Sequence, residues 1–187
     1  MHIHSSASFA GLSAMWVAMM TAMMAPTVWP WVNAYHRLGS HTSLFVSGYV
    51  AAWAIYSIAA AGLQILIGPV SPSIAATILI GAGLFQFASI KAACLTHCRN
   101  PFTYFLAKWR NGPSGGFHMG FGHGLFCVAC CWALMITTLA VGMTNLWWMA
   151  LLTLVAFAEQ VLPFGDRLRK PVGGALIVAG LAVLAAK

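Results

Sequence analysis

The chain consists mostly of long apolar segments that contain almost no charged residues. The stretch from Ser43 to Ile67, for example, has no acidic or basic side chain and is closed by Gly-Pro-Val-Ser-Pro. Across the chain 61% of the residues are hydrophobic and 6% are charged, whereas soluble domains carry about a quarter charged residues. A water-facing surface cannot be built from this composition, so the sequence predicts an integral membrane protein.

Crossing the hydrocarbon layer requires about 20 apolar residues, and the chain offers about six segments of this kind. Since no basic region precedes the first segment, it is expected to be a retained span and not a cleaved signal. Pro26 and Pro30 should end or kink it. The fold expected is an all-α polytopic membrane protein, one helical bundle in a single domain over residues 1–187. The predicted spans are 9–27, 43–67, 74–93 (or to 98), 117–142, 146–162 and 172–186.

Basic residues gather in alternate loops, which predicts the orientation. Because positive loops stay in the cytoplasm, loops 1–2, 3–4 and 5–6 are predicted to be cytoplasmic and both termini outside, as for a bacterial inner membrane protein. The net charge of +7 is therefore interpreted as membrane orientation, with the lipid bilayer and not nucleic acid as partner. The bases concerned are Arg37; Lys91, Arg99, Lys108 and Arg110; and Arg167, Arg169 and Lys170.

The loop between the third and fourth spans is predicted to contain a short interfacial helix. Asn100-Pro101 is a helix start signal because proline is well tolerated at the first helical position. Phe102, Phe105, Leu106 and Trp109 then share one face, as expected for a helix that lies on the membrane surface. The glycine-rich stretch 111–116 should break this helix before the fourth span.

Cysteine and histidine side chains cluster in the fourth span. His123, Cys127, Cys130 and Cys131 follow the spacing that places side chains on one face of a helix. Thiolate and imidazole ligands suit Cu(I), zinc or an iron–sulfur centre better than a hard cation. An odd total of five cysteines also excludes a fully paired disulfide framework.

A second group of candidate ligands, Cys94, His97 and Cys98, stands at the end of the third span. Glu159, the acidic residue inside the fifth span, is expected in the same leaflet, and intramembrane ionisable groups are costly and usually functional or paired. Its expected partner is Lys91, Arg99, an imidazole or a bound cation. The predicted metal ligand pool is therefore Cys94, His97, Cys98, His123, Cys127, Cys130, Cys131 and Glu159.

Simpler explanations remain open for several of these residues. Free cysteine often packs as a small hydrophobe, and methionine fills gaps between helices. The stripe Met15, Met19 and Met23 could form a thioether ladder for Cu(I), but packing is favoured. His2 and His4 could chelate an ion, His118 could cap a helix or bind one, and Gln64 and Gln86 are expected to make hydrogen bonds between helices.

At these residues the chain resembles a bacterial family of predicted metal-binding integral membrane proteins. The resemblance covers most of the chain and departs from the family at Ala88–Ile90, Ala129 and Gln160, where it leaves the candidate ligands in place. It implies a membrane protein that binds a metal but does not name the ion or a reaction. The segments that carry it are Met15–Pro26, Phe85–Phe87, Lys91–Pro101, Gly120–Met135, Gly142–Met149, and Glu159 before Pro163.

The leading hypothesis is a membrane protein that binds a soft transition metal, copper first and zinc or iron next. Its role would be metal handling, alone, as a homo-oligomer or as an accessory subunit of a membrane complex. The alternative is an enzyme, either a thiol–disulfide oxidoreductase that uses Cys127 and Cys130 against Cys94 and Cys98, or a metal-centred oxidoreductase. A structural subunit whose cysteines only pack is the remaining interpretation.

Overall fold

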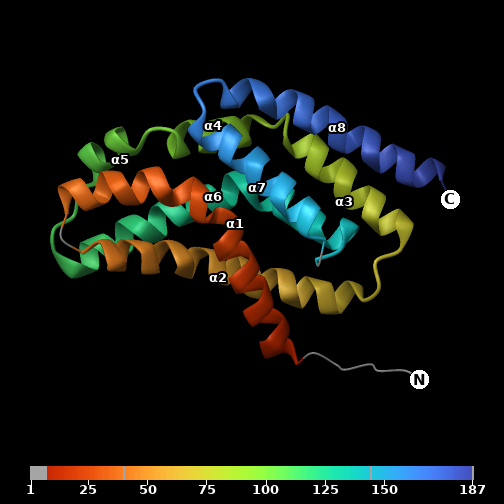
Figure 1. Ribbon diagram of the computed structural model, residues 1–187, viewed down its shortest axis with the longest axis horizontal. Helices are drawn as coiled ribbons and strands as arrows, with labels where there is room; N and C mark the ends of the chain where they lie inside the picture. The colour runs from red at the N-terminus through yellow and green to blue at the C-terminus, as the bar shows by residue number, and fades with distance from the viewer. Residues whose placement is uncertain (1–7, 40, 144, 187) are drawn as a thin grey trace.

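The computed structural model describes residues 8–39, 41–143 and 145–186, and this part of the chain is entirely helical outside its connections. Eight helices follow one another (Figure 1). The all-helical prediction is therefore confirmed. The helices are α1 (Phe9–Leu38), α2 (Thr42–Ile67), α3 (Pro72–Phe85), α4 (Ser89–Cys98), α5 (Pro101–Lys108), α6 (Gly112–Val141), α7 (Leu146–Val161) and α8 (Gly165–Ala185).

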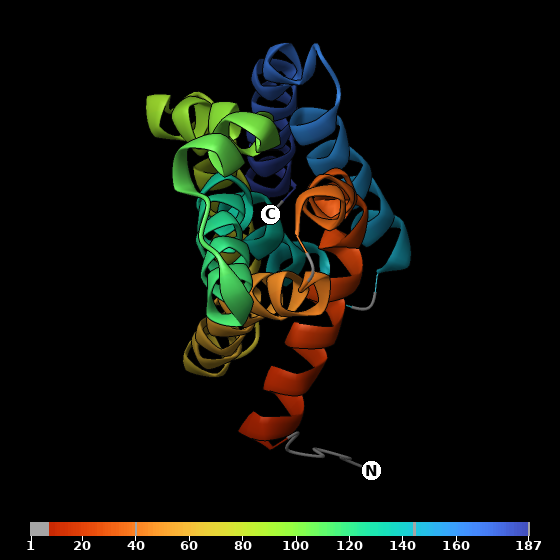
Figure 2. The ribbon, with the colours of Figure 1, turned by 90° about the vertical axis from the view of Figure 1, so that its left-hand side faces the viewer.

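Helix α1 continues through both of its prolines and does not end at them. Pro26 and Pro30 lie inside this 30-residue helix, and the helix changes direction along its length (Figure 1). Proline removes one backbone hydrogen bond and its ring crowds the preceding turn, which kinks a helix. Of the two outcomes predicted for Pro26 and Pro30, the kink is the one found. The N-terminal half of α1 descends toward the N-terminus in Figure 2 and packs against α2, because Trp16 is fully buried and its Nε1 donates to Gln64 at 2.8 Å.

The most extensive helix pairing joins α2 to α6, and glycines allow it. A Cβ atom on Gly120 would fall on the carbonyl oxygen of Phe45, and one on Gly48 would fall on the carbonyl oxygen of Phe117. Small residues let helix backbones approach this closely, as in membrane helix pairs. The stretch 111–116 was predicted to break the interfacial helix before the fourth span. Helix α5 does end before α6, but the break lies at residues 109–111, and the stretch from Gly112 onward already belongs to α6.

The third predicted span is broken into two helices. α3 and α4 meet at an angle of 68°, and Gln86 to Ala88 form the break. The carbonyl oxygens of Gln86 and Ala88 accept hydrogen bonds from Arg169 Nη1 of α8 at 3.2 and 3.1 Å. A continuous helix to Cys98 was the wrong expectation, because a cation from a distant helix satisfies the carbonyls that the break leaves free.

Four helices, α1, α2, α6 and α8, are long and apolar enough to cross a membrane, and five spans result if α3 and α4 count as one. Helix α7 has 16 residues, fewer than the roughly 20 that a span perpendicular to the membrane needs. The prediction of six spans therefore stays a prediction. Helix α5 begins at Pro101 as expected, and its Phe102 and Leu106 side chains are exposed while Phe105 is buried.

Candidate metal centre

Three cysteines of α6 form a compact group of sulfur atoms. Because α6 is unbroken here, Cys127, Cys130 and Cys131 lie on one face, and their Sγ atoms are all within 4.8 Å of one another. Each residue is at most 1% exposed, and all three are free thiols. The arrangement predicted from the helical spacing is therefore present.

Cys98 brings a fourth sulfur from α4. Its Sγ lies 3.8 Å from the Sγ of Cys130, and its backbone carbonyl accepts a hydrogen bond from Trp31 Nε1 at 2.7 Å. The bend between α3 and α4 directs the last turn of α4 against α6, and the Trp31 bond holds that turn in place. Four thiols from two helices thus meet in the interior; we call Cys98, Cys127, Cys130 and Cys131 the thiol cluster.

Two polar side chains from other helices bond to the thiol cluster. Gln160 of α7 donates from Nε2 to Cys131 Sγ at 2.9 Å and accepts from Cys127 Sγ at 3.6 Å. The Tyr49 hydroxyl of α2 lies 3.3 Å from Cys127 Sγ. Sequence reasoning missed both as site residues. The sequence does contain one indication: Gln160 is a second polar residue directly after Glu159 in an otherwise apolar helix, and such a residue needs a buried partner.

The two predicted histidine ligands lie beside the cluster among aromatic rings. His123 stacks on Trp31 with ring centroids 3.6 Å apart, and His97 stacks on Phe126 at 3.8 Å. His123 Nδ1 and His97 Nε2 are buried and have no hydrogen-bond partner among the described residues. A buried ring nitrogen without a partner is costly, so both imidazoles keep a free donor or acceptor atom near the thiols.

Glu159 is paired with a lysine. Its Oε2 lies 2.7 Å from Lys91 Nζ, with both side chains fully buried, and its Oε1 accepts a hydrogen bond from Gln86 Nε2 at 3.1 Å. Lys91 was one of the partners expected for Glu159. Both carboxylate oxygens are thus engaged by protein groups.

The remaining predicted residues make no hydrogen bond to the thiol cluster among the described residues. Cys94 is half-buried, and among the described residues it makes no hydrogen bond to the thiol cluster. Met19 and Met23 belong to the hydrophobic core, whereas Met15 is 45% exposed. Gln64 accepts a hydrogen bond from Trp16 Nε1 of α1 at 2.8 Å, so its predicted interhelical role is confirmed.

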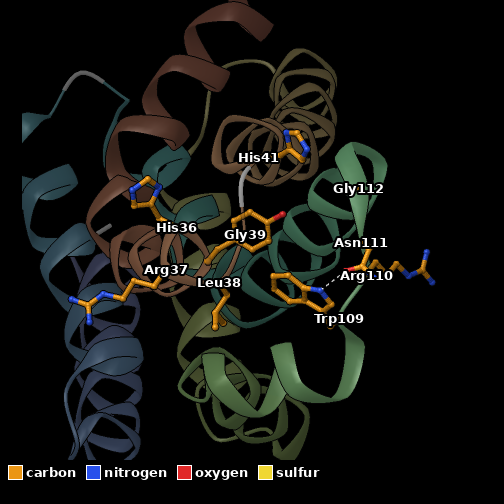
Figure 3. A pocket seen from close by; sticks show the side chains of 10 residues that line it. His36, Arg37, Leu38, Gly39, His41, Trp109, Arg110, Asn111 and Gly112 are labelled. Carbon is orange, nitrogen blue, oxygen red and sulfur yellow. Dashed lines mark hydrogen bonds between the residues drawn. The ribbon is translucent and has the colours of Figure 1, made fainter.

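The other histidines lie away from the cluster. His118 bonds through Nδ1 to the Ser114 carbonyl at 2.8 Å. His36 and His41 line a surface cavity of about 480 Å³ with Arg37 and Arg110, but the two arginine side chains point away from each other (Figure 3). This cavity therefore does not bring its cations together on one ligand. His2 and His4 lie outside the described residues.

Helix α5 covers the aromatic rings next to the thiol cluster. Its Tyr104 hydroxyl donates to the Met119 carbonyl of α6 at 3.1 Å, and Tyr104 packs edge-on against both Trp31 and His97. Burial raises the pKa of the Tyr104 hydroxyl, while nearby Arg110 lowers it. The hydroxyl is therefore protonated at neutral pH and keeps its hydrogen bond.

These features define a helical protein with a buried cluster of soft metal ligands. The chain matches the family described as copper chaperone (PpoB2) over residues 13–183. It therefore belongs to this copper chaperone family, which supports the predicted metal handling. Neither a curated protein nor a solved structure shows significant similarity to it.

The thiol cluster fits copper as cargo by its donor chemistry. Cu(I) prefers thiolate and thioether ligands, and the described residues gather four thiols without a disulfide among them. Family membership and the buried cysteines therefore agree on copper handling as the coarse function.

Proposed function

We propose that this chain is an integral membrane copper chaperone that holds Cu(I) in the thiol cluster and passes it to a membrane-bound acceptor. The observation that carries the proposal is the 3.8 Å approach of Cys98 Sγ to Cys130 Sγ. It joins two cysteine groups that are 32 positions apart in the sequence. Sulfurs from two separate helices enclose an ion better than one helix face can, because ligands then approach from two sides.

Membrane insertion is supported by the outward-facing side chains. Large apolar residues on the candidate spans and on α7 are strongly exposed, including Leu66 at 85%, Trp147 at 88% and Val178 at 67%. Contiguous exposed apolar surface marks contact with a membrane or a partner. The lipid bilayer of a bacterial inner membrane is the proposed environment, and the copper acceptor is a further subunit of a membrane complex or a second copy of this chain.

The proposed orientation places the thiol cluster toward the cytoplasm. The basic residues of the predicted cytoplasmic loops include Arg99, which directly follows Cys98 in the α4–α5 connection, and Lys108 at the end of α5. Cytoplasmic thiols are kept reduced, which suits Cu(I) binding. His123 joins the thiols in the proposed ligand pool, His97 and Cys94 stand one position and one turn before Cys98, and Glu159 balances charge through Lys91.

Copper content of serine variants tests the proposal. The detergent-purified protein, loaded anaerobically with Cu(I) and dialysed, is expected to retain roughly one ion per chain, as a shared thiolate site predicts. Cys98→Ser/Cys130→Ser should lose it, whereas the matched variant Cys94→Ser should retain it. Elemental analysis decides: no copper in the wild type, or equal copper in the double variant, would overturn the thiol cluster as the binding site.

The same sulfur approach also favours a second candidate function, thiol–disulfide exchange. A thiolate at Cys130 could attack a mixed disulfide formed on Cys98, because the two sulfurs are already in contact and exchange requires such an approach. A Cys130→Ser variant that traps a mixed disulfide on Cys98 in cells, with no copper in the wild type, would support this function in place of copper delivery.

A further inference from the structure

The thiol cluster is enclosed, so an ion cannot reach it directly from the surface. Cys98 is 3% exposed, and the three cysteines of α6 are at most 1% exposed. Protein interiors are close-packed, and an ion that enters must pass along a path where ligands replace its carrier. A path for copper therefore requires a surface opening next to one member of the cluster.

A surface cleft of about 550 Å³ lies between α4 and α5 at this position. Its lining includes His97, Asn100, Tyr104 and Lys108. His97 is the residue directly before Cys98, so the last turn of α4 presents the imidazole to the cleft and the thiol to the cluster. An adjoining cavity of about 500 Å³ shares Tyr104, Ala107 and Lys108 with the cleft and is also lined by His118 and Met119.

The His97 ring lines the cleft, and its residue is the direct neighbour of Cys98 in the chain. It stacks on Phe126, which directly precedes Cys127, and it packs edge-on against Tyr104 at 5.0 Å. Its Nε2 atom is buried and has no hydrogen-bond partner among the described residues. This free nitrogen of His97 is available to bind a copper ion, because imidazole is a suitable ligand for copper.

We propose that the α4–α5 cleft is the path by which Cu(I) enters and leaves, and that His97 is the transfer ligand that hands the ion to Cys98. This inference rests on the proposed function. His97 binds the ion only in passing, and the thiol cluster holds it at equilibrium.

The charge of the cleft indicates the form in which copper arrives. Lys108 is the charged side chain among the cleft-lining residues and repels a free cation. An anionic Cu(I)–thiolate complex is attracted instead. The carrier class is therefore a thiolate complex, either a small thiol such as glutathione or the cysteine of a delivering protein.

The transfer is a ligand exchange without a redox change. The bond from copper to the carrier thiolate breaks as a bond to the His97 nitrogen forms, and the carrier thiolate takes up a proton from water. The His97 bond then breaks as Cys98 binds, and the Cys98 thiol releases its proton to water. Copper remains Cu(I) throughout, and release follows the same steps in reverse.

The rate of copper transfer tests the role of His97. Full-length protein in detergent is loaded with Cu(I) from excess glutathione and then mixed with bathocuproine disulfonate, whose Cu(I) complex is coloured. The His97→Phe variant keeps an aromatic ring on Phe126 but lacks the nitrogen. It should release copper at least about tenfold more slowly, because the exchange step loses an intermediate ligand, while its copper content at equilibrium stays that of the wild type.

Two further variants make the result specific. His118→Phe changes a histidine that lines the adjoining cavity but not the cleft, and it should release copper at the wild-type rate. His97→Met restores a soft donor and should recover most of the rate. Unchanged release in His97→Phe, slow release in His118→Phe, or loss of bound copper in His97→Phe would each overturn the transfer role. An inability of the wild type to bind Cu(I) would instead refute the proposed function itself.

Discussion

Lys91 and Glu159 form an ion pair in the interior, with 2.7 Å between Nζ and Oε2 and no solvent exposure of either side chain. The pair joins α4 to α7, and Gln86 at the α3–α4 break donates to the other carboxylate oxygen at 3.1 Å. Charges in such a place stabilise a fold only when both partners are present, since each alone leaves an uncompensated buried charge.

Removal of one partner should therefore cost more than removal of both. Lys91→Met or Glu159→Gln is expected to lower the free energy of unfolding by about 3–5 kcal/mol, whereas the double variant should recover most of this loss. Unfolding of the detergent-solubilised protein, followed by circular dichroism, measures the difference. Asp166→Asn is the control, because the Asp166 carboxylate is 58% exposed and its loss leaves no fully buried charge. Additive losses in the double variant would contradict the paired role.

The glycines of α6 provide a separate test of packing. Gly120→Ala should destabilise the protein by about 1–3 kcal/mol, because the added methyl group meets the backbone of Phe45 and forces α2 away from α6. Gly81→Ala in α3 is the matched control. Nothing lies within 4 Å of its added Cβ, so it should stabilise the helix by about 0.5–1 kcal/mol. Equal effects of the two changes would show that the close approach does not matter.

The helical content and the α6 cysteine face could be predicted from the sequence because both depend on local spacing. Cys127, Cys130 and Cys131 need only an unbroken helix to share one face. The contribution of Cys98 was predicted as part of a pool, but its contact with Cys130 depends on how α4 packs. That packing follows from the bend after Phe85, which no proline marks in the sequence.

The bend and the Gln160 contacts could not be predicted because they depend on residues distant in sequence. Arg169 stabilises the break from α8, 83 positions after Gln86. Gln160 and Cys131 are 29 positions apart. Polar residues in apolar helices signal that a partner exists, but a single sequence does not say which partner. Glu159 shows the same limit, since Lys91 was one of several candidates.

Gln160 should tune copper binding through its hydrogen bonds to two thiols. Replacing it by leucine removes the donor to Cys131 and the acceptor for Cys127. Loss of a group that orients metal ligands typically weakens binding about 10–100-fold, so Gln160→Leu should raise the dissociation constant for Cu(I) by a factor in that range. Competition with a coloured Cu(I) chelator measures it.

The control for this change is Gln64→Leu, which removes a half-buried glutamine that bonds to Trp16 and not to the cluster. It should leave copper affinity unchanged even if stability falls. A loss of affinity in Gln64→Leu as large as in Gln160→Leu would mean that the effect comes from general loosening of the helices and not from the thiol contacts.

Arg169 links the α3–α4 break to the thiol cluster. Its guanidinium satisfies the carbonyl oxygens of Gln86 and Ala88, and the direction of α4 after the break places Cys98 against Cys130. Arg169→Gln should leave two buried carbonyls without partners, each costing about 1–3 kcal/mol. Straightening of the break would relieve that cost but would move Cys98 away from α6.

This predicts that Arg169→Gln lowers copper affinity although Arg169 bonds to no cysteine. The matched variant Arg167→Gln removes an exposed arginine two positions earlier and should bind copper as the wild type does. A cross-link between Cys98 and Cys130, formed by mild oxidation of the copper-free protein, gives a second readout. The cross-link should form more slowly in Arg169→Gln only, because the change acts through the position of α4. If Arg169→Gln cross-links at the wild-type rate but binds copper more weakly, the loss of affinity does not come from a displaced Cys98, and the proposed link between the break and the thiol cluster is wrong.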